Sequence, residues 1–214
     1  MSQQETPPKP RPTQWWARRM RVPLGFVTAA VYVFEVARRP AHPAAIAWSL
    51  ALVLPGIALR AAASGTVKKN RELAMTGPYA YTRNPLYLGS MLIAAGFAVA
   101  LLSWPLALLL AAGFAIIYIP VIASEEQFLR STFPGFEEYC RRVPRLIPRL
   151  TPAKAQSGEA VAPDAAIAEP SSSGFSFALY RKHREYNAAI GAALLYLSLL
   201  YLRPALEVLL NRLR

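Results

Sequence analysis

The chain has 214 residues, of which 54% are hydrophobic and only 17% are charged. That apolar share exceeds the roughly 45–50% of ordinary soluble domains. The net charge is +12, but the basic residues stand in short segments beside long apolar runs, with few aromatic residues among them. This pattern argues against a nucleic-acid-binding protein and favours contact with anionic lipid headgroups. We therefore expect an integral membrane protein.

The apolar runs predict an all-α fold, a polytopic bundle of four to five transmembrane helices. A spanning helix needs about 20 mostly apolar residues. The first expected span covers residues 22–37 and follows Trp15 and Trp16, which suit the membrane interface. The second covers residues 44–63, where the long side chain of Arg60 is able to reach the headgroups.

Residues 85–103 and 105–123 form the third and fourth expected spans, and Ser103-Trp104-Pro105 breaks the chain between them. Each run begins with a proline, which suits the first turn of a helix because its missing N–H is not needed there. The two runs therefore predict a helical hairpin. Beyond it, residues 124–150 read as a short amphipathic helix and a basic, proline-punctuated strip.

The domain organisation follows from these runs. Residues 1–21 form an N-terminal tail, and residues 22–150 form a membrane core. Residues 151–174 are rich in Ala, Pro, Ser and Gly, which is typical of a flexible linker. Residues 175–214 contain an interfacial segment and an apolar run long enough for a fifth span, although it is also compatible with a helix lying flat.

The basic residues predict the orientation of the chain. Nineteen of the 24 lysines and arginines fall in the N-terminal tail, the loop between the second and third spans, or the region after the fourth. Since basic loops stay on the cytoplasmic side, these three regions and the N-terminus are expected there.

Two polar clusters flank the expected hairpin and point to a binding site. Arg83, Asn84 and Tyr87 stand where the third span enters the membrane, and Glu125 and Glu126 where the fourth leaves it. A hairpin brings its two ends together, so these side chains should share one pocket on the cytoplasmic side. A guanidinium suits a carboxylate, acids suit an ammonium or hydroxyls, and aromatic rings attract cations. S-adenosylmethionine carries such a set of groups.

The motifs around the hairpin appear in a fixed order. They are Gly77-Pro78-Tyr79, Arg83-Asn84-Pro85-Leu86-Tyr87-x-Gly89, Glu125-Glu126-x-x-Leu129, Phe133, Tyr139 and Val143-Pro144-Arg145-Leu146-Ile147-Pro148. This series resembles the isoprenylcysteine carboxyl methyltransferase and phospholipid methyltransferase superfamily of membrane enzymes. The resemblance covers about residues 60–149 and rests on the ordered set rather than on any single motif.

From the residues themselves we predict Arg83, Glu125 and Glu126 as catalytic residues, with Arg83 and Tyr79 holding the polar end of the methyl donor and the acidic pair orienting donor or acceptor. The apolar setting suggests a lipid, a lipidated molecule or a small apolar acceptor. The resemblance implies a helical membrane fold and an S-adenosylmethionine-dependent methyltransferase. The residues that it implies for cofactor binding are Arg71, Glu72, Leu73, Ala74, Tyr79, Asn84, Pro85, Leu86, Tyr87, Glu125 and Glu126.

The chain departs from the family pattern at two places that bear on chemistry. The position after Arg83 is often histidine, whereas Asn84 exchanges hydrogen bonds but cannot carry a proton charge. The arginine expected a few residues ahead of the acidic pair has no match, because Ile119–Ala123 is apolar. This weakens the case for a prenylcysteine carboxylate as the acceptor.

Alternative interpretations remain open at this stage. Related motifs occur in NADPH-dependent lipid and sterol reductases, and a non-catalytic membrane adaptor would keep the same fold. Glu125 and Glu126 could be an ordinary exposed helix start. The strip of Arg141, Arg142 and Arg145 is expected to contact headgroups. Two distant histidines give too few ligands for a metal site, so no metal is expected.

Overall fold

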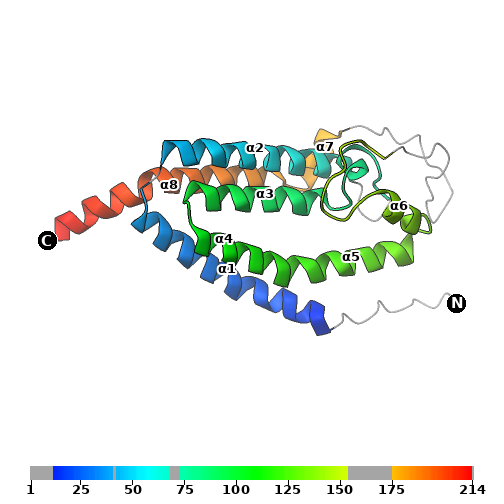
Figure 1. The fold of residues 1–214 in the computed structure, drawn as a ribbon, viewed down its shortest axis with the longest axis horizontal. Coiled ribbons are helices and arrows are strands. Elements are labelled where there is room, and N and C mark those ends of the chain that lie inside the picture. Colours follow the sequence, from blue (N-terminus) through cyan, green and yellow to red (C-terminus); the bar gives the residue numbers. More distant parts are fainter. Residues whose placement is uncertain (1–11, 41, 68–72, 154–174, 214) are drawn as a thin grey trace.

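The computed structural model describes residues 12–40, 42–67, 73–153 and 175–213. Within these ranges all regular secondary structure is helical, which confirms the all-α prediction (Figure 1). The α-helices are α1 (Pro12–Arg38), α2 (Pro43–Thr66), α3 (Pro85–Ala100), α4 (Trp104–Gly113), α5 (Ile119–Thr132), α6 (Phe136–Arg142), α7 (Phe177–Lys182) and α8 (Tyr186–Leu213). A 3₁₀ turn, η1 (Gly77–Ala80), precedes α3, and a π-helical segment, η2 (Phe114–Tyr118), joins α4 to α5.

The helices form two layers (Figure 1). One layer contains α2, α3 and α8, and the other contains α1 and the continuous helix from α4 to α5. The turn between α3 and α4 lies at one end of the bundle, whereas η1, α6 and α7 gather at the other end. The predicted hairpin is therefore present, and its open end faces the short polar elements.

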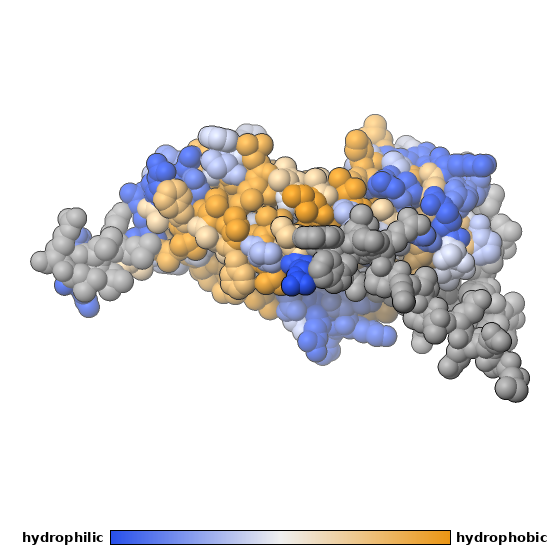
Figure 2. Space-filling view, turned by 90° about the horizontal axis from the view of Figure 1, so that it is seen from below, coloured by the Kyte–Doolittle hydropathy of each residue, from blue (hydrophilic) through white to orange (hydrophobic). Residues whose placement is uncertain are grey.

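Three helices are long and apolar enough to cross a membrane: Pro43–Thr66, Trp104–Thr132 and Tyr186–Ala205. Helix α3 is apolar but has only 16 residues. Between 11% and 22% of the residues in the most apolar windows of the three long helices are buried, so most of their side chains face outward. Apolar side chains cover much of the middle of the visible face, and hydrophilic ones gather at its two ends and in a patch at the lower edge of the middle (Figure 2). This arrangement is that of a membrane helix bundle, and it includes the last apolar run as a candidate span.

A π-helical segment and a proline distinguish the fourth apolar run from a uniform α-helix. Pro120 has no N–H to donate, and its ring would collide with the carbonyl four residues earlier in a regular α-helix. The wider turn of residues 114–118 lies directly before it. The helix then continues to Thr132, so Glu125 and Glu126 lie inside a long helix rather than at an exposed helix start.

The turn between α3 and α4 is fixed by local hydrogen bonds and by α1. Leu102 adopts a left-handed conformation with φ 48°, and the N–H of Ser103 donates to the carbonyl of Ala98. This pairing satisfies carbonyls left free at the end of α3. The side chain of Ser103 accepts from the N–H of Leu106, and Arg39 donates to the carbonyl of Leu102 at 2.7 Å. The hairpin is thereby anchored at the closed end of the bundle.

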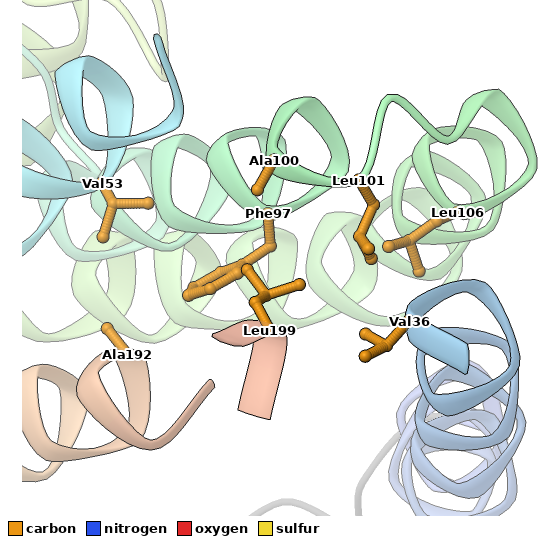
Figure 3. Packing of buried hydrophobic residues seen from close by; sticks show 8 residues of the cluster. All are labelled: Val36, Val53, Phe97, Ala100, Leu101, Leu106, Ala192 and Leu199. Atoms are coloured by element: carbon orange, nitrogen blue, oxygen red, sulfur yellow. The ribbon is translucent and has the colours of Figure 1, made fainter. Parts of the chain in front are cut away.

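A buried apolar cluster joins both layers near that end. Its residues come from α1, α2, α3, α4 and α8, and they are Val36, Val53, Phe97, Ala100, Leu101, Leu106, Ala192 and Leu199 (Figure 3). Two polar pairs add to it, because Tyr196 bonds Ser49 of α2 and Tyr32 of α1 bonds Ser198. Such interhelical hydrogen bonds are typical of membrane bundles. Helix α8 is thus an integral part of the bundle.

Small residues allow α2 and α3 to approach each other closely. A Cβ atom at Gly56 would lie 2.8 Å from the backbone oxygen of Gly89, and a Cβ atom at Gly89 would lie 2.7 Å from the oxygen of Gly56. Both contacts involve backbone atoms, which cannot rotate away. Close backbone approach through glycine is a common way to join membrane helices.

Gly56→Ala should therefore separate α2 from α3 and destabilise the fold. We expect a loss of about 1–3 kcal/mol, the usual cost of overpacking a core. The measurement is thermal unfolding in detergent. Gly191→Ala is the matched control, because nothing lies within 4 Å of a Cβ atom there. Equal melting temperatures for the two variants would contradict the close-packing argument.

Candidate active site

A cavity of about 460 Å³ lies where η1, the start of α3, the middle of α5 and α6 meet. We call it the polar cavity because Arg60, Arg83, Glu125 and Glu126 line it among apolar residues. This volume falls within the range of about 300–1,000 Å³ that is usual for small-molecule sites. Ten of the residues predicted for the site line it: Leu73, Ala74, Tyr79, Arg83, Asn84, Pro85, Leu86, Tyr87, Glu125 and Glu126. Arg71 and Glu72 lie outside the described residues. The two ends of the hairpin thus share one cavity, as the sequence predicted.

Glu126 is the buried acid of the pair and binds two arginines. Its carboxylate lies 3.2 Å from Nη1 of Arg83 and accepts a hydrogen bond from Nε of Arg145 at 3.0 Å. Nη2 of Arg145 donates to the second carboxylate oxygen. The side chain of Glu126 is only 8% exposed, and a buried carboxylate needs such partners to remain charged. The carboxylate thereby joins the start of α3, the middle of α5 and the strip after α6.

The role of Arg145 differs from the predicted one. The sequence analysis assigned the strip of Arg141, Arg142 and Arg145 to lipid headgroups, but Arg145 faces inward to Glu126. The strip itself runs beside the residues before α3. The backbone N–H of Arg83 donates to the carbonyl of Pro144, and the side-chain amide of Asn84 donates to the carbonyl of Arg145 at 3.0 Å. The backbone of the strip therefore holds the predicted site residues in place.

Arg83 stands between the acid and a thiol. Its Nη1 donates to the sulfur of Cys140 as well as lying beside Glu126. Burial raises the pKa of the Cys140 thiol, which keeps it neutral and able to accept this contact. The Nε atom of Arg83 is buried, and no described residue accepts its hydrogen bond. Arg83 therefore keeps an unused donor within the site.

Glu125 has a different environment from its neighbour. It is exposed, and the hydroxyl of Tyr87 donates to it at 2.8 Å. The ring of Tyr87 meets the ring of Tyr118 edge to face, with centroids 5.2 Å apart. Tyr118 comes from the π-helical segment, two helical turns before Glu125. A carboxylate and two aromatic rings at one edge of the cavity form a setting that attracts cations.

Two buried tyrosines, Tyr79 and Tyr139, also line the cavity. The hydroxyl of Tyr139 donates to the carbonyl of Tyr79 at 2.8 Å. Burial raises the pKa of both phenols well above the ordinary tyrosine value, and the nearby charges of Glu125 and Glu185 raise that of Tyr79 further. Phe133, Phe136 and Val143 pack with Tyr139 into a second apolar cluster under the cavity. Both phenols therefore remain protonated hydrogen-bond donors at neutral pH.

The raised pKa values predict a loss of stability in alkali. Tyrosines of the unfolded chain ionise near pH 10, whereas the two folded phenols hold their protons to higher pH. The unfolded state then binds fewer protons, so the free energy of unfolding falls as pH rises above about 10. In detergent, the melting temperature of Tyr139→Phe should fall less steeply there than that of Tyr81→Phe, which removes the hydroxyl of an exposed tyrosine. Identical slopes would contradict this assignment.

A second, apolar cavity of about 490 Å³ adjoins the first. It lies between α1, α3, α4 and η2, and its walls include Leu24, Met91, Ala94 and Ile117. Ser90 and Tyr118 line both cavities. A polar compartment at the end of the bundle thus borders an apolar compartment between its spanning helices.

Several residues of the polar cavity escaped the sequence analysis. They include Arg60, Ser90 and Tyr118. Arg145, which binds the lining residue Glu126, was not predicted for the site either. Arg60 does not extend to headgroups as predicted, because Glu185 and Ser90 bind its guanidinium. Tyr118 precedes Glu125 by seven residues, about two helical turns, so the two lie on one helix face. This spacing was the sequence signal that could have predicted Tyr118 as a site residue.

The fold and the cavity define a membrane helix bundle with an ion-paired site at the open end of a hairpin. Residues 59–135 match the phospholipid methyltransferase family. This match confirms the resemblance seen in the sequence and is consistent with the isoprenylcysteine and phospholipid methyltransferase superfamily. Residues 59–135 include most of the residues that line the polar cavity but not Phe136 or Tyr139. Arg145 and Glu185, which bind lining residues, also lie outside the match.

Two curated proteins are similar to part of the chain. The cobalt-zinc-cadmium resistance protein of Cupriavidus metallidurans is 42% identical over 84 residues, 39% of each chain. The nickel-cobalt-cadmium resistance protein of Alcaligenes xylosoxydans xylosoxydans is 40% identical over 90 residues, 42% of each chain. The match therefore spans about two fifths of either relative. No solved structure gives a significant match.

Proposed function

We propose that this chain is an integral membrane methyltransferase that uses S-adenosylmethionine and acts on a lipid, a lipidated molecule or a small apolar acceptor. The observation that carries the proposal is the pair of adjoining cavities. One is lined by ion-paired residues, and the other is apolar and lies between α1, α3 and α4. A methyl donor with charged groups suits the first and an apolar acceptor suits the second. The excess of basic residues in the loops beside the polar cavity favours its placement at the cytoplasmic face.

The residues of the polar cavity fit the chemistry of the methyl donor. Arg83 has a buried N–H without an acceptor among the described residues, and a guanidinium suits the donor's carboxylate. Glu125 suits its ammonium or its ribose hydroxyls. The rings of Tyr87 and Tyr118 suit its sulfonium. When bound, S-adenosylmethionine supplies an activated methyl group on that sulfonium.

The protein's part in the reaction is then positioning and proton transfer. Arg83 and Tyr79 hold the polar end of the methyl donor, and Glu126 fixes Arg83. Positioning of two reactants can lower a barrier by about 7–11 kcal/mol. Glu125 is exposed to the cavity and is able to accept a proton from an amine acceptor, directly or through water. A carboxylate acceptor would need no such base.

Removal of the guanidinium tests methyl-donor binding. Since a hydrogen bond to a charged group is worth about 1.5–3 kcal/mol, Arg83→Ala should weaken S-adenosylmethionine binding about 10- to 100-fold. Calorimetry in detergent measures this affinity, and thermal unfolding checks that the variant is folded. Arg142→Ala is the matched control, because Arg142 pairs with the more exposed Glu138 on α6. Wild-type affinity in folded Arg83→Ala would contradict the proposed site, and tight NADPH binding would favour a reductase.

Filling the apolar cavity tests the acceptor compartment. Ala94 lines it from α3, and Ala94→Phe should block it while leaving the ion pairs of the polar cavity intact. We expect methyl transfer to total membrane lipid to fall about 10- to 100-fold, since small displacements of a reactant have such effects. S-adenosylmethionine affinity should stay within about twofold of wild type, because the polar cavity keeps its partners. Ala51→Phe, on the exposed face of α2, is the control. Unimpaired labelled-methyl transfer in Ala94→Phe would refute this assignment.

A further inference from the structure

An acid far along the chain binds Arg60, one of two arginines that line the polar cavity. Glu185 lies between α7 and α8, well beyond residues 59–135. One of its carboxylate oxygens accepts from Nη2 of Arg60 at 2.8 Å and from Nε at 3.1 Å. The side chain of Glu185 is 13% exposed and that of Arg60 is 23% exposed. Both partners are thus largely removed from solvent, and each neutralises the other.

The remaining nitrogen of the Arg60 guanidinium, Nη1, contacts the first turns of α3. Nη1 of Arg60 donates to the hydroxyl of Ser90 at 2.5 Å and to the carbonyl of Leu86 at 3.3 Å. Leu86 lines the polar cavity, and Ser90 lines both cavities. The side chain of Arg60 therefore connects Glu185 to the part of α3 that carries Tyr87.

Gly89 allows the arginine to take this path. A Cβ atom at Gly89 would lie 2.6 Å from Cγ of Arg60, so only glycine leaves room for the arginine stem to cross α3. This gives a physical reason for the glycine that ends the motif Arg83-Asn84-Pro85-Leu86-Tyr87-x-Gly89. The motif thus accommodates the arginine as well as forming the cavity.

The segment that carries Glu185 is itself docked on α2. The N–H of Ser176 donates to the carbonyl of Gly65 at 2.8 Å, and Nδ1 of His183 lies 2.9 Å from the carbonyl of Ser64. The ring of Phe175 occupies the space beside Gly65, where a Cβ atom would lie 2.3 Å from it. These contacts fix the backbone near Glu185, so its carboxylate is able to orient the guanidinium of Arg60.

We propose that Glu185 is a positioning residue of the methyl-donor site, acting through Arg60 on Leu86 and Ser90. The C-terminal segment is then part of the functional site, although the family match ends at residue 135. This inference rests on the proposed function. The planar guanidinium of Arg60 binds its three partners, Glu185, Ser90 and Leu86, in one fixed geometry. Loss of the Glu185 carboxylate should therefore displace the start of α3 and weaken methyl-donor binding.

The experiment is a double-mutant cycle read out by S-adenosylmethionine affinity. Glu185→Gln and Arg60→Gln should each weaken binding about tenfold, the effect of losing one charged hydrogen bond. The double variant should be no weaker than the worse single variant, because both changes break the same linkage. Glu138→Gln, which removes an exposed glutamate bound to Arg142, is the matched control. Melting temperatures show that the variants are folded.

The outcomes separate this inference from the proposed function. Failure of the wild-type protein to bind S-adenosylmethionine would overturn the proposed function, and the inference with it. Wild-type binding together with control-like affinity in folded Glu185→Gln, or additive losses in the double variant, would overturn the positioning role alone. If Glu185→Gln does not fold, Arg60→Lys replaces it. Lysine keeps the charge but cannot bridge Glu185, Ser90 and Leu86, so undiminished affinity in Arg60→Lys would equally overturn the inference.

Discussion

The buried carboxylate of Glu126 determines how the open end of the bundle is built. It binds Arg83 from the start of α3 and Arg145 from the strip after α6, while its own backbone belongs to α5. Three segments that are distant in the sequence therefore meet at one charge. Because an unpaired buried carboxylate is costly, the hairpin, the strip and the cavity between them are interdependent.

The two adjacent acids, Glu125 and Glu126, differ in burial and in their partners. Glu126 is buried and committed to two guanidinium groups, so its contribution is to hold the site together. Glu125, one residue earlier and about 100° around the helix, is exposed to the cavity and bound by a phenol. A neutral partner leaves its negative charge available to a cationic ligand or a proton. Consecutive acids on a helix thus supply one buried, ion-paired group and one group exposed at the cavity.

The sequence predicted the hairpin and most of the polar cavity, because both depend on local order. Long apolar runs define helices, and a hairpin necessarily brings its ends together. The sequence could not predict that Arg145 turns inward, since a basic strip beside a membrane has the same composition whether it binds lipid or an acid. Arg60 was misjudged for a similar reason. Its partner, Glu185, lies 125 residues away, and only the packing of α7 on α2 brings the two together.

The distribution of the cavity residues separates two parts of the proposed enzyme. The matched segment supplies Arg83, both acids and the first turn of α3, the groups expected to hold a methyl donor. Contacts from outside that segment reach the same groups, through Arg145 on one side and Glu185 on the other. The apolar cavity also takes a wall from α1. Within the described residues, contacts from outside the matched segment therefore complete the proposed methyl-donor site.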